Sequence, residues 1–209
     1  RANFEISRPA RWAYSDIPAD LITAYDFIAA SGELQRYAAE INMDVEREVI
    51  RGFFMNTVET CAQKQENYSN MSPEYWRRMA LTGRVLGIPE YVHLAVARCY
   101  EFLDFGFYFD GAWWEVTGSY HQQSINYIGE VSKVLQGYSD PKGFRSRFDG
   151  ENFRNIDLLS DNQTASLARD LVRDYMLYPD NKIVTINDTW GGRQRRDGKV
   201  IPSNYISSW

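Results

Sequence analysis

Side chains able to do chemistry are concentrated in one segment, residues 110–121, which reads Asp-Gly-Ala-Trp-Trp-Glu-Val-Thr-Gly-Ser-Tyr-His. The segment is too polar for a core element and too aromatic for an ordinary surface loop. Trp113 and Trp114 offer flat apolar faces of the kind that stack on sugar rings. Tyr120 and His121 carry groups that can transfer protons. The segment therefore predicts a site that holds a sugar and moves protons.

The composition indicates one globular domain over residues 1–209, with 44% apolar and 24% charged residues. Aromatic residues make up 15% of the chain, which fits a carbohydrate-binding protein and a large aromatic core equally well. The net charge of -5 argues against nucleic acid as a partner. Five arginines form local basic clusters: Arg145, Arg147, Arg193, Arg195 and Arg196. They could line a basic cleft for an acidic polysaccharide, or they could be ordinary solvated surface charges.

Several site classes lack support in the sequence. Cys61 and Cys99 fall in helical patterns and are expected to be buried free thiols, although a single disulfide stays open. No His and Cys spacing predicts a metal site, and no cofactor is expected, since there is neither a phosphate loop nor a nucleophile elbow. His93 lies within a helical pattern and is interpreted as structural. No apolar run is long enough to span a membrane.

Hydrophobic periodicity, prolines and glycines predict a chain of helices. Ser72 is expected to cap one helix, and Gly52 to kink another. Lys182–Ile186 alternates like a short strand. The fold class is therefore all-α, as a helical-hairpin array or incomplete α/α toroid with a short β segment near the C-terminus. The predicted helices cover residues 19–30, 33–65, 72–86, 89–105, 119–135, 151–159 and 163–177.

Three segments in order resemble the heparinase II/III-like polysaccharide lyases, over roughly residues 60–190. They are the Asn-containing turn 67–70, the Asp-Gly-…-Glu-…-Tyr-His segment 110–121, and the segment 176–189 with its Pro-Asp-Asn and Asp-Thr pairs. The chain has Asn70-Met71 where many members have Asn-His. It also has Pro-Asp-Asn where many have Pro-Asp-Gly.

The resemblance implies β-elimination at a uronic acid within a polysaccharide, on part of a helical toroid. Asn70 is then the candidate that neutralises the substrate carboxylate, with Asn67 as the substitute. Tyr120 is the candidate base and acid, helped by a predicted helix start because the positive end of a helix favours a phenolate. His121 could assist. Glu115 could share a proton with the substrate or orient His121.

The remaining candidates would bind substrate. Trp113, Trp114 and Trp190 are candidate platforms for sugar rings, and Asp188 and Arg193 could line the same cleft. Several of these candidates also have a structural interpretation: Asn70 and Asn67 as turn formers, Tyr120 and the tryptophans as core residues, and His121 as a structural donor.

Two other functions stay open. A glycoside hydrolase would need two carboxylates across a sugar site, with Asp110 paired with Glu115 or Asp188. A helical carbohydrate-binding domain would need no catalysis. We expect a piece of a longer periplasmic or secreted bacterial lyase. Its β-sheet domain would lie outside these residues, so the isolated chain could bind glycan without turning it over.

Overall fold

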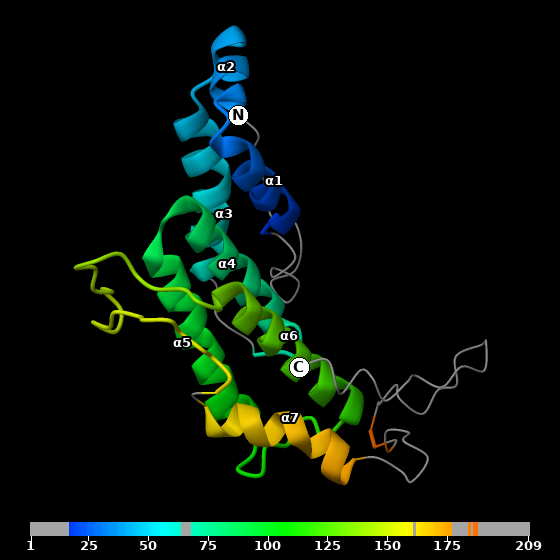
Figure 1. Ribbon diagram of the computed structural model, residues 1–209. Coiled ribbons are helices and arrows are strands. Elements are labelled where there is room, and N and C mark those ends of the chain that lie inside the picture. Colours follow the sequence, from blue (N-terminus) through cyan, green and yellow to red (C-terminus); the bar gives the residue numbers. More distant parts are fainter. Residues whose placement is uncertain (1–16, 64–67, 161, 177–183, 185, 188–209) are drawn as a thin grey trace, which may run out of the picture.

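The computed structural model describes residues 17–63, 68–160, 162–176, 184 and 186–187, and these form an all-α protein (Figure 1). The predicted fold class is therefore confirmed. Within these ranges no β-strand occurs, and an isolated antiparallel bridge joins Phe107 to Trp113. The strand predicted at 182–186 lies mostly outside the described residues. The toroid remains a prediction.

Four helices form the main body: α4 (Ser72–Leu86), α5 (Pro89–Gly106), α6 (Gly118–Leu135) and α7 (Gln163–Tyr175). Helix α4 packs against both α5 and α6, and α7 crosses the far end of that layer (Figure 1). Prolines sit in the first turn of α4 and α5, where a missing N–H costs nothing. This arrangement brings the N-terminus of α6 beside α7.

An aromatic cluster joins these helices at the centre of the core. Trp76 of α4 meets Phe102 of α5 with ring centroids 5.3 Å apart. Phe102 in turn lies 5.0 Å from Trp113, which follows α5. Trp76, Phe102 and Trp113 are all fully buried, so the segment after α5 is part of the core on one side.

The N-terminal part differs from the single helix predicted over 33–65. It contains α1 (Ala19–Ala29), α2 (Glu33–Glu40), the π-helix η2 (Glu46–Met55) and α3 (Asn56–Ala62). Asn42 takes the left-handed conformation (φ 52°) and ends α2. A Cβ on Gly52 would lie 2.8 Å from the Arg47 carbonyl oxygen. Glycine at 52 thus permits the wide turn where the sequence predicted a kink.

The helix predicted near 151–159 is wrong, because side chains take the backbone groups that such a helix would use. The Phe153 N–H donates to Asp140 at 2.6 Å, and the Asn155 N–H donates to the Ser139 hydroxyl at 2.9 Å. Asn155 also has a positive φ of 48°. The segment therefore runs as an irregular loop alongside α5 and α6 (Figure 1).

His93 of α5 fastens this loop to the body, and its predicted structural role is confirmed. The buried imidazole lies 2.8 Å from Asp140 through Nε2 and 3.1 Å from Asp149 through Nδ1. Its ring stacks on Phe153 at 3.8 Å. The Tyr138 hydroxyl donates to the second oxygen of Asp140 at 2.7 Å. One buried carboxylate therefore organises the start of the loop.

Candidate functional site

The segment after α5 folds back on itself before α6 begins. The Tyr108 N–H donates to the Ala112 carbonyl at 2.8 Å, and the Trp114 N–H donates to the Gly106 carbonyl at 3.0 Å. Asp110 accepts from the Ala112 N–H at 3.0 Å and so closes the tip. We call residues 107–117 the aromatic loop. Its geometry fixes where the candidate residues of the segment 110–121 lie.

Gly111 lets the tip of the aromatic loop approach α7. Its φ is +86°, and a Cβ there would lie 2.6 Å from the Ala168 backbone nitrogen. We expect Gly111→Ala to lower the free energy of unfolding by about 2–4 kcal/mol, through backbone strain together with overlap against α7. Chemical denaturation measures this value.

Gly143 provides the matched control, because its φ is +83° and no atom lies within 4 Å of its hypothetical Cβ. Gly143→Ala should introduce the backbone strain without the overlap, and so lower the free energy of unfolding by about 1 kcal/mol. Equal losses of unfolding free energy in the two variants would show that Gly111 does not lie close enough to α7 for an added Cβ to overlap it.

His121 is a structural residue, which corrects its assignment as a catalytic assistant. Its Nδ1 accepts from the Trp113 N–H at 3.0 Å, and its Nε2 donates to the Ala168 carbonyl at 2.6 Å. The side chain is 1% exposed, so both nitrogens are used and no substrate reaches them. The imidazole therefore joins the aromatic loop, α6 and α7 as a neutral tautomer.

Burial lowers the pKa of His121 and outweighs the opposing effects of the Ala168 carbonyl and Asp110. In an unfolded chain a histidine titrates near about pH 6.5. Below that pH the unfolded state binds more protons than the folded state does. The stability that the neutral ring contributes is thus complete above about pH 6.5 and is lost as pH falls towards the lower folded-state pKa.

The variant His121→Asn tests this pH dependence. Its carbonyl can still accept from the Trp113 N–H, but it does not titrate. We expect the stability difference between the wild type and this variant to shrink from about pH 7.5 to about pH 5.5 in urea unfolding. A difference that stays constant over this range would contradict a neutral buried His121.

The two adjacent tryptophans have opposite surroundings. Trp113 is fully buried and has no face for a sugar ring, which corrects its assignment as a platform. Its indole N–H donates to Glu115 at 2.7 Å. Since both ring nitrogens of His121 have other partners, Glu115 does not orient His121. Trp114 is 49% exposed and remains a candidate platform.

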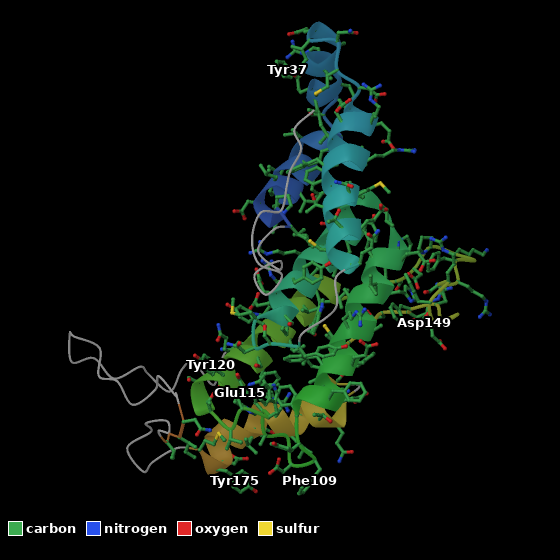
Figure 2. All side chains as sticks on the ribbon, turned by 180° about the vertical axis from the view of Figure 1, so that it is seen from behind. Tyr37, Phe109, Glu115, Tyr120, Asp149 and Tyr175 are labelled. Atoms are coloured by element: carbon green, nitrogen blue, oxygen red, sulfur yellow. The ribbon has the colours of Figure 1, made fainter. Side chains whose placement is uncertain are left out.

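Three other aromatic side chains close to Trp114 in the sequence are also exposed: Phe105, Tyr108 and Phe109, at 77%, 51% and 97%. Figure 2 shows Phe109 at the end of the molecule near α7, and Glu115 and Tyr120 towards the same end. The exposed phenylalanines were missed in the sequence. A hydrophobic pattern alone does not tell an exposed loop tip from a core contact.

Asn70 contacts the first half of α6. The Asn70 amide donates to the Gln123 side-chain oxygen at 2.7 Å, although 53 residues separate them. Tyr120 lies three positions before Gln123, so the two residues are neighbours on one face of α6. Thr117 caps the helix by accepting from the Tyr120 N–H at 3.2 Å. We call Asn70, Tyr120 and Gln123 the amide–phenol surface.

Gln123 is the residue that the sequence analysis missed here. Its amide N–H also contacts the Met71 sulfur at 3.1 Å, where many members of the resembling family have histidine. The spacing from Tyr120 to Gln123 is the signal that could have identified it. Tyr120 is half-buried, with its ring packed against the core and its backbone held by the cap.

Asn187 brings the end of the described chain to the aromatic loop. Its amide donates to the Glu115 and Val116 carbonyls at 3.0 and 3.2 Å. Val116 has a positive φ of 52°, which is rare for a β-branched residue and marks local strain. The other candidates lie outside the described residues: Asn67, Asp188, Trp190 and Arg193.

The described arginines of the basic clusters lie elsewhere. Arg145 donates to the Gly150 carbonyl, and Arg147 pairs with Glu90. Both belong to the loop that contains Asp149, which is well separated from Tyr120 in Figure 2. Cys61 and Cys99 are buried free thiols, as predicted. Among the described residues, no three His, Cys, Asp or Glu side chains are placed to hold a metal ion.

No helix in the described part of the chain has both the length and the apolar character needed to cross a membrane. Comparison of the chain with family models and curated proteins, and of its structure with solved structures, found no match.

Proposed function

We propose that the chain is part of a polysaccharide lyase that cleaves a uronic-acid-containing glycan by β-elimination. The main support is the contact between Asn70 and Gln123, which brings an amide donor to the helix face that carries Tyr120. Resemblance of the segment 110–121 to heparinase II/III-like lyases adds to it. A periplasmic or secreted location is part of the same proposal.

The chemistry assigns a role to each member of the amide–phenol surface. Asn70 has a second amide hydrogen beyond the one given to Gln123, and that hydrogen can bind the substrate carboxylate. Charge builds up on this carboxylate as the neighbouring proton leaves, so a fixed donor stabilises the transition state. Gln123 orients Asn70 and acts as a positioning residue.

Tyr120 then transfers the proton. As a phenolate it removes the proton next to the carboxylate, and the freed electron pair forms a carbon–carbon double bond. The bond from the ring to the glycosidic oxygen breaks, and that oxygen takes a proton from the phenol. The products are an unsaturated uronate and a new sugar end, and no water is consumed.

The proposal is tested by incubating the chain, alone and within any longer parent protein, with a panel of uronate polysaccharides. Elimination creates a conjugated double bond that absorbs in the ultraviolet, and hydrolysis does not. A rise in absorbance supports the lyase. New reducing ends without absorbance support the glycoside hydrolase alternative, with Asp110 and Glu115 as its described acids.

A second candidate, a non-catalytic carbohydrate-binding domain, is supported by the exposure of Trp114 and the neighbouring aromatic side chains. Trp114→Ala should weaken glycan binding about three- to tenfold, as expected for one aromatic contact of about 0.5–1.5 kcal/mol. Tyr120→Phe should leave binding unchanged under this candidate. Isothermal titration with an oligouronate measures both, and binding that persists without Trp114 would contradict its role as a platform.

A further inference from the structure

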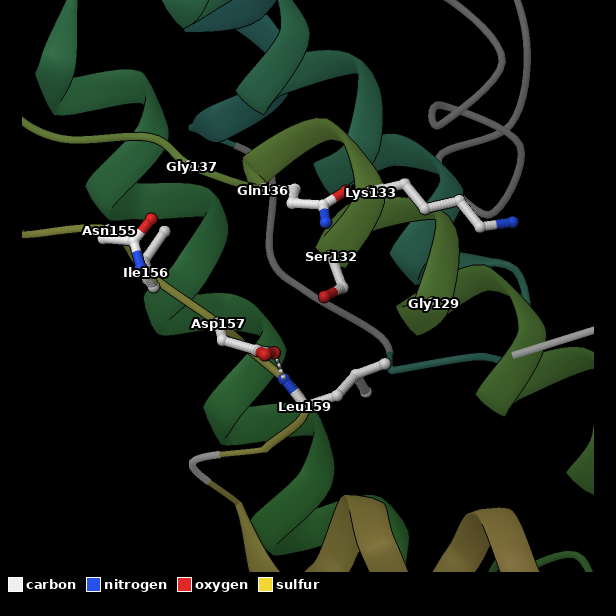
Figure 3. Close-up of a pocket in the computed structure, with 9 residues that line it drawn as sticks. All are labelled: Gly129, Ser132, Lys133, Gln136, Gly137, Asn155, Ile156, Asp157 and Leu159. Atoms are coloured by element: carbon white, nitrogen blue, oxygen red, sulfur yellow. Dashed lines mark hydrogen bonds between the residues drawn. The ribbon is translucent and has the colours of Figure 1, made fainter.

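A cavity of about 320 Å³ lies between the second half of α6 and the loop segment 155–159 (Figure 3). One wall carries Ser132 and Gln136, and the other carries Asn155 and Asp157. Ser132 and Asp157 point towards one another across the gap in Figure 3. Its size falls at the lower end of the range of about 300–1,000 Å³ found for small-molecule sites.

The cavity is distinct from the amide–phenol surface. Successive residues of an α-helix are turned by about 100°, so Gly129 and Gln136 share one side of α6. Tyr120 and Gln123 lie on a different side, separated from Gly129 by roughly 100° or more. The two surfaces therefore face different parts of the molecule, and neither depends on the other.

The polar groups of the cavity are placed for a ligand with hydroxyls. Gln136 and Asn155 are exposed and Ser132 is half-buried, and among the described residues their side chains make no hydrogen bond to protein atoms, so they are open to solvent or to a ligand. Asp157 is held in place, since one carboxylate oxygen accepts from the N–H groups of Leu159 at 3.2 Å and Ser160 at 3.3 Å. The backbone and side-chain hydrogen bonds from Ser160 lower its pKa, so the group is a carboxylate near neutral pH.

No cation of the lining balances that carboxylate. Lys133 bonds to Glu130 at 2.7 Å, and its ammonium runs away from the loop in Figure 3. Ile156 and Leu159 supply apolar contacts. The lining thus combines carboxamides, a hydroxyl and a carboxylate with apolar surface.

We propose that this cavity binds a neutral sugar residue. Carboxamides donate to one sugar hydroxyl and accept from another, and a carboxylate accepts from hydroxyl pairs. The same carboxylate repels a uronate, so the site favours neutral sugars over uronates. This inference goes beyond the proposed function and does not rest on it.

The test is a titration of the isotope-labelled chain with maltose, cellobiose and lactose, followed by nuclear magnetic resonance. Saturable shifts are expected at Gly129, Gly137 and the side-chain amides of Gln136 and Asn155. Galacturonate should bind at least tenfold more weakly than the best neutral disaccharide. Ethanolamine is included because a carboxylate could instead recognise an amine.

Paired variants separate specific binding from damage to the fold. The paired variant combines Asn155→Gly, which keeps the positive φ and removes the side-chain amide, with Gln136→Ala. It should weaken sugar binding at least tenfold. Lys142→Ala, at an exposed position outside the lining, is the control and should bind as the wild type does. The proposal is overturned if no neutral sugar gives saturable shifts at these residues, if ethanolamine binds more tightly than the sugars, or if the paired variant binds normally.

Discussion

Tyr120→Phe is expected to reduce the rate of uronate elimination by about a hundredfold or more, while the protein stays folded. The variant removes only the hydroxyl to which we assign the proton transfer. The ring, which packs against the core, and the cap from Thr117 to the Tyr120 N–H both remain. Ultraviolet absorbance of the unsaturated product measures the rate, in whichever form of the protein shows activity.

Tyr37→Phe is the control, because Tyr37 is exposed on α2, at the end of the molecule opposite Tyr120 in Figure 2. Its rate should stay within about threefold of the wild type. A loss of rate in Tyr37→Phe that equals the loss in Tyr120→Phe would point to a general disturbance of the fold. Wild-type activity in Tyr120→Phe would remove Tyr120 from the chemistry.

Asp140→Ala is expected to lower the free energy of unfolding by about 3–5 kcal/mol. Its carboxylate accepts from His93, the Tyr138 hydroxyl and the Phe153 N–H, and the Asp140 side chain is fully buried. Removal leaves several donors without a partner, and each unsatisfied buried group costs about 1–3 kcal/mol. Denaturant unfolding measures the loss.

Asp149→Ala gives the comparison on the same histidine. Asp149 is 34% exposed, so water can replace it and the expected loss is about 1 kcal/mol. Similar losses of unfolding free energy in the two variants would contradict the claim that the buried Asp140 carboxylate stabilises the loop more than the partly exposed Asp149 does.

The helices that local signals define could be predicted from the sequence. Prolines in the first turns of α4 and α5 and apolar periodicity placed their boundaries within one or two residues. The prediction that Ser72 caps α4 was wrong. Met71 occupies the cap position, and the Ser72 hydroxyl accepts from the Ser69 N–H. Short-range sequence patterns predict the existence of a helix better than they predict its terminal residues.

Features decided by distant contacts could not be predicted. The roles of His121 and Trp113 depend on Ala168 and on the aromatic cluster, which lie on other helices. The same holds for the loop near Phe153, where Asp140 takes the N–H that a helix would have used. Gln123 became a candidate only because Asn70 reaches it across 53 residues.

The central claim is elimination without water, and the most direct test is to run the reaction in water labelled with heavy oxygen. Mass spectrometry of the oligosaccharide products then shows whether solvent oxygen has entered the cleaved bond. The account predicts that neither product carries label at the cleaved bond. It also predicts that the product with the unsaturated uronate is lighter by one water than the corresponding hydrolysis product. Labelled products of full mass would contradict it and establish a hydrolase.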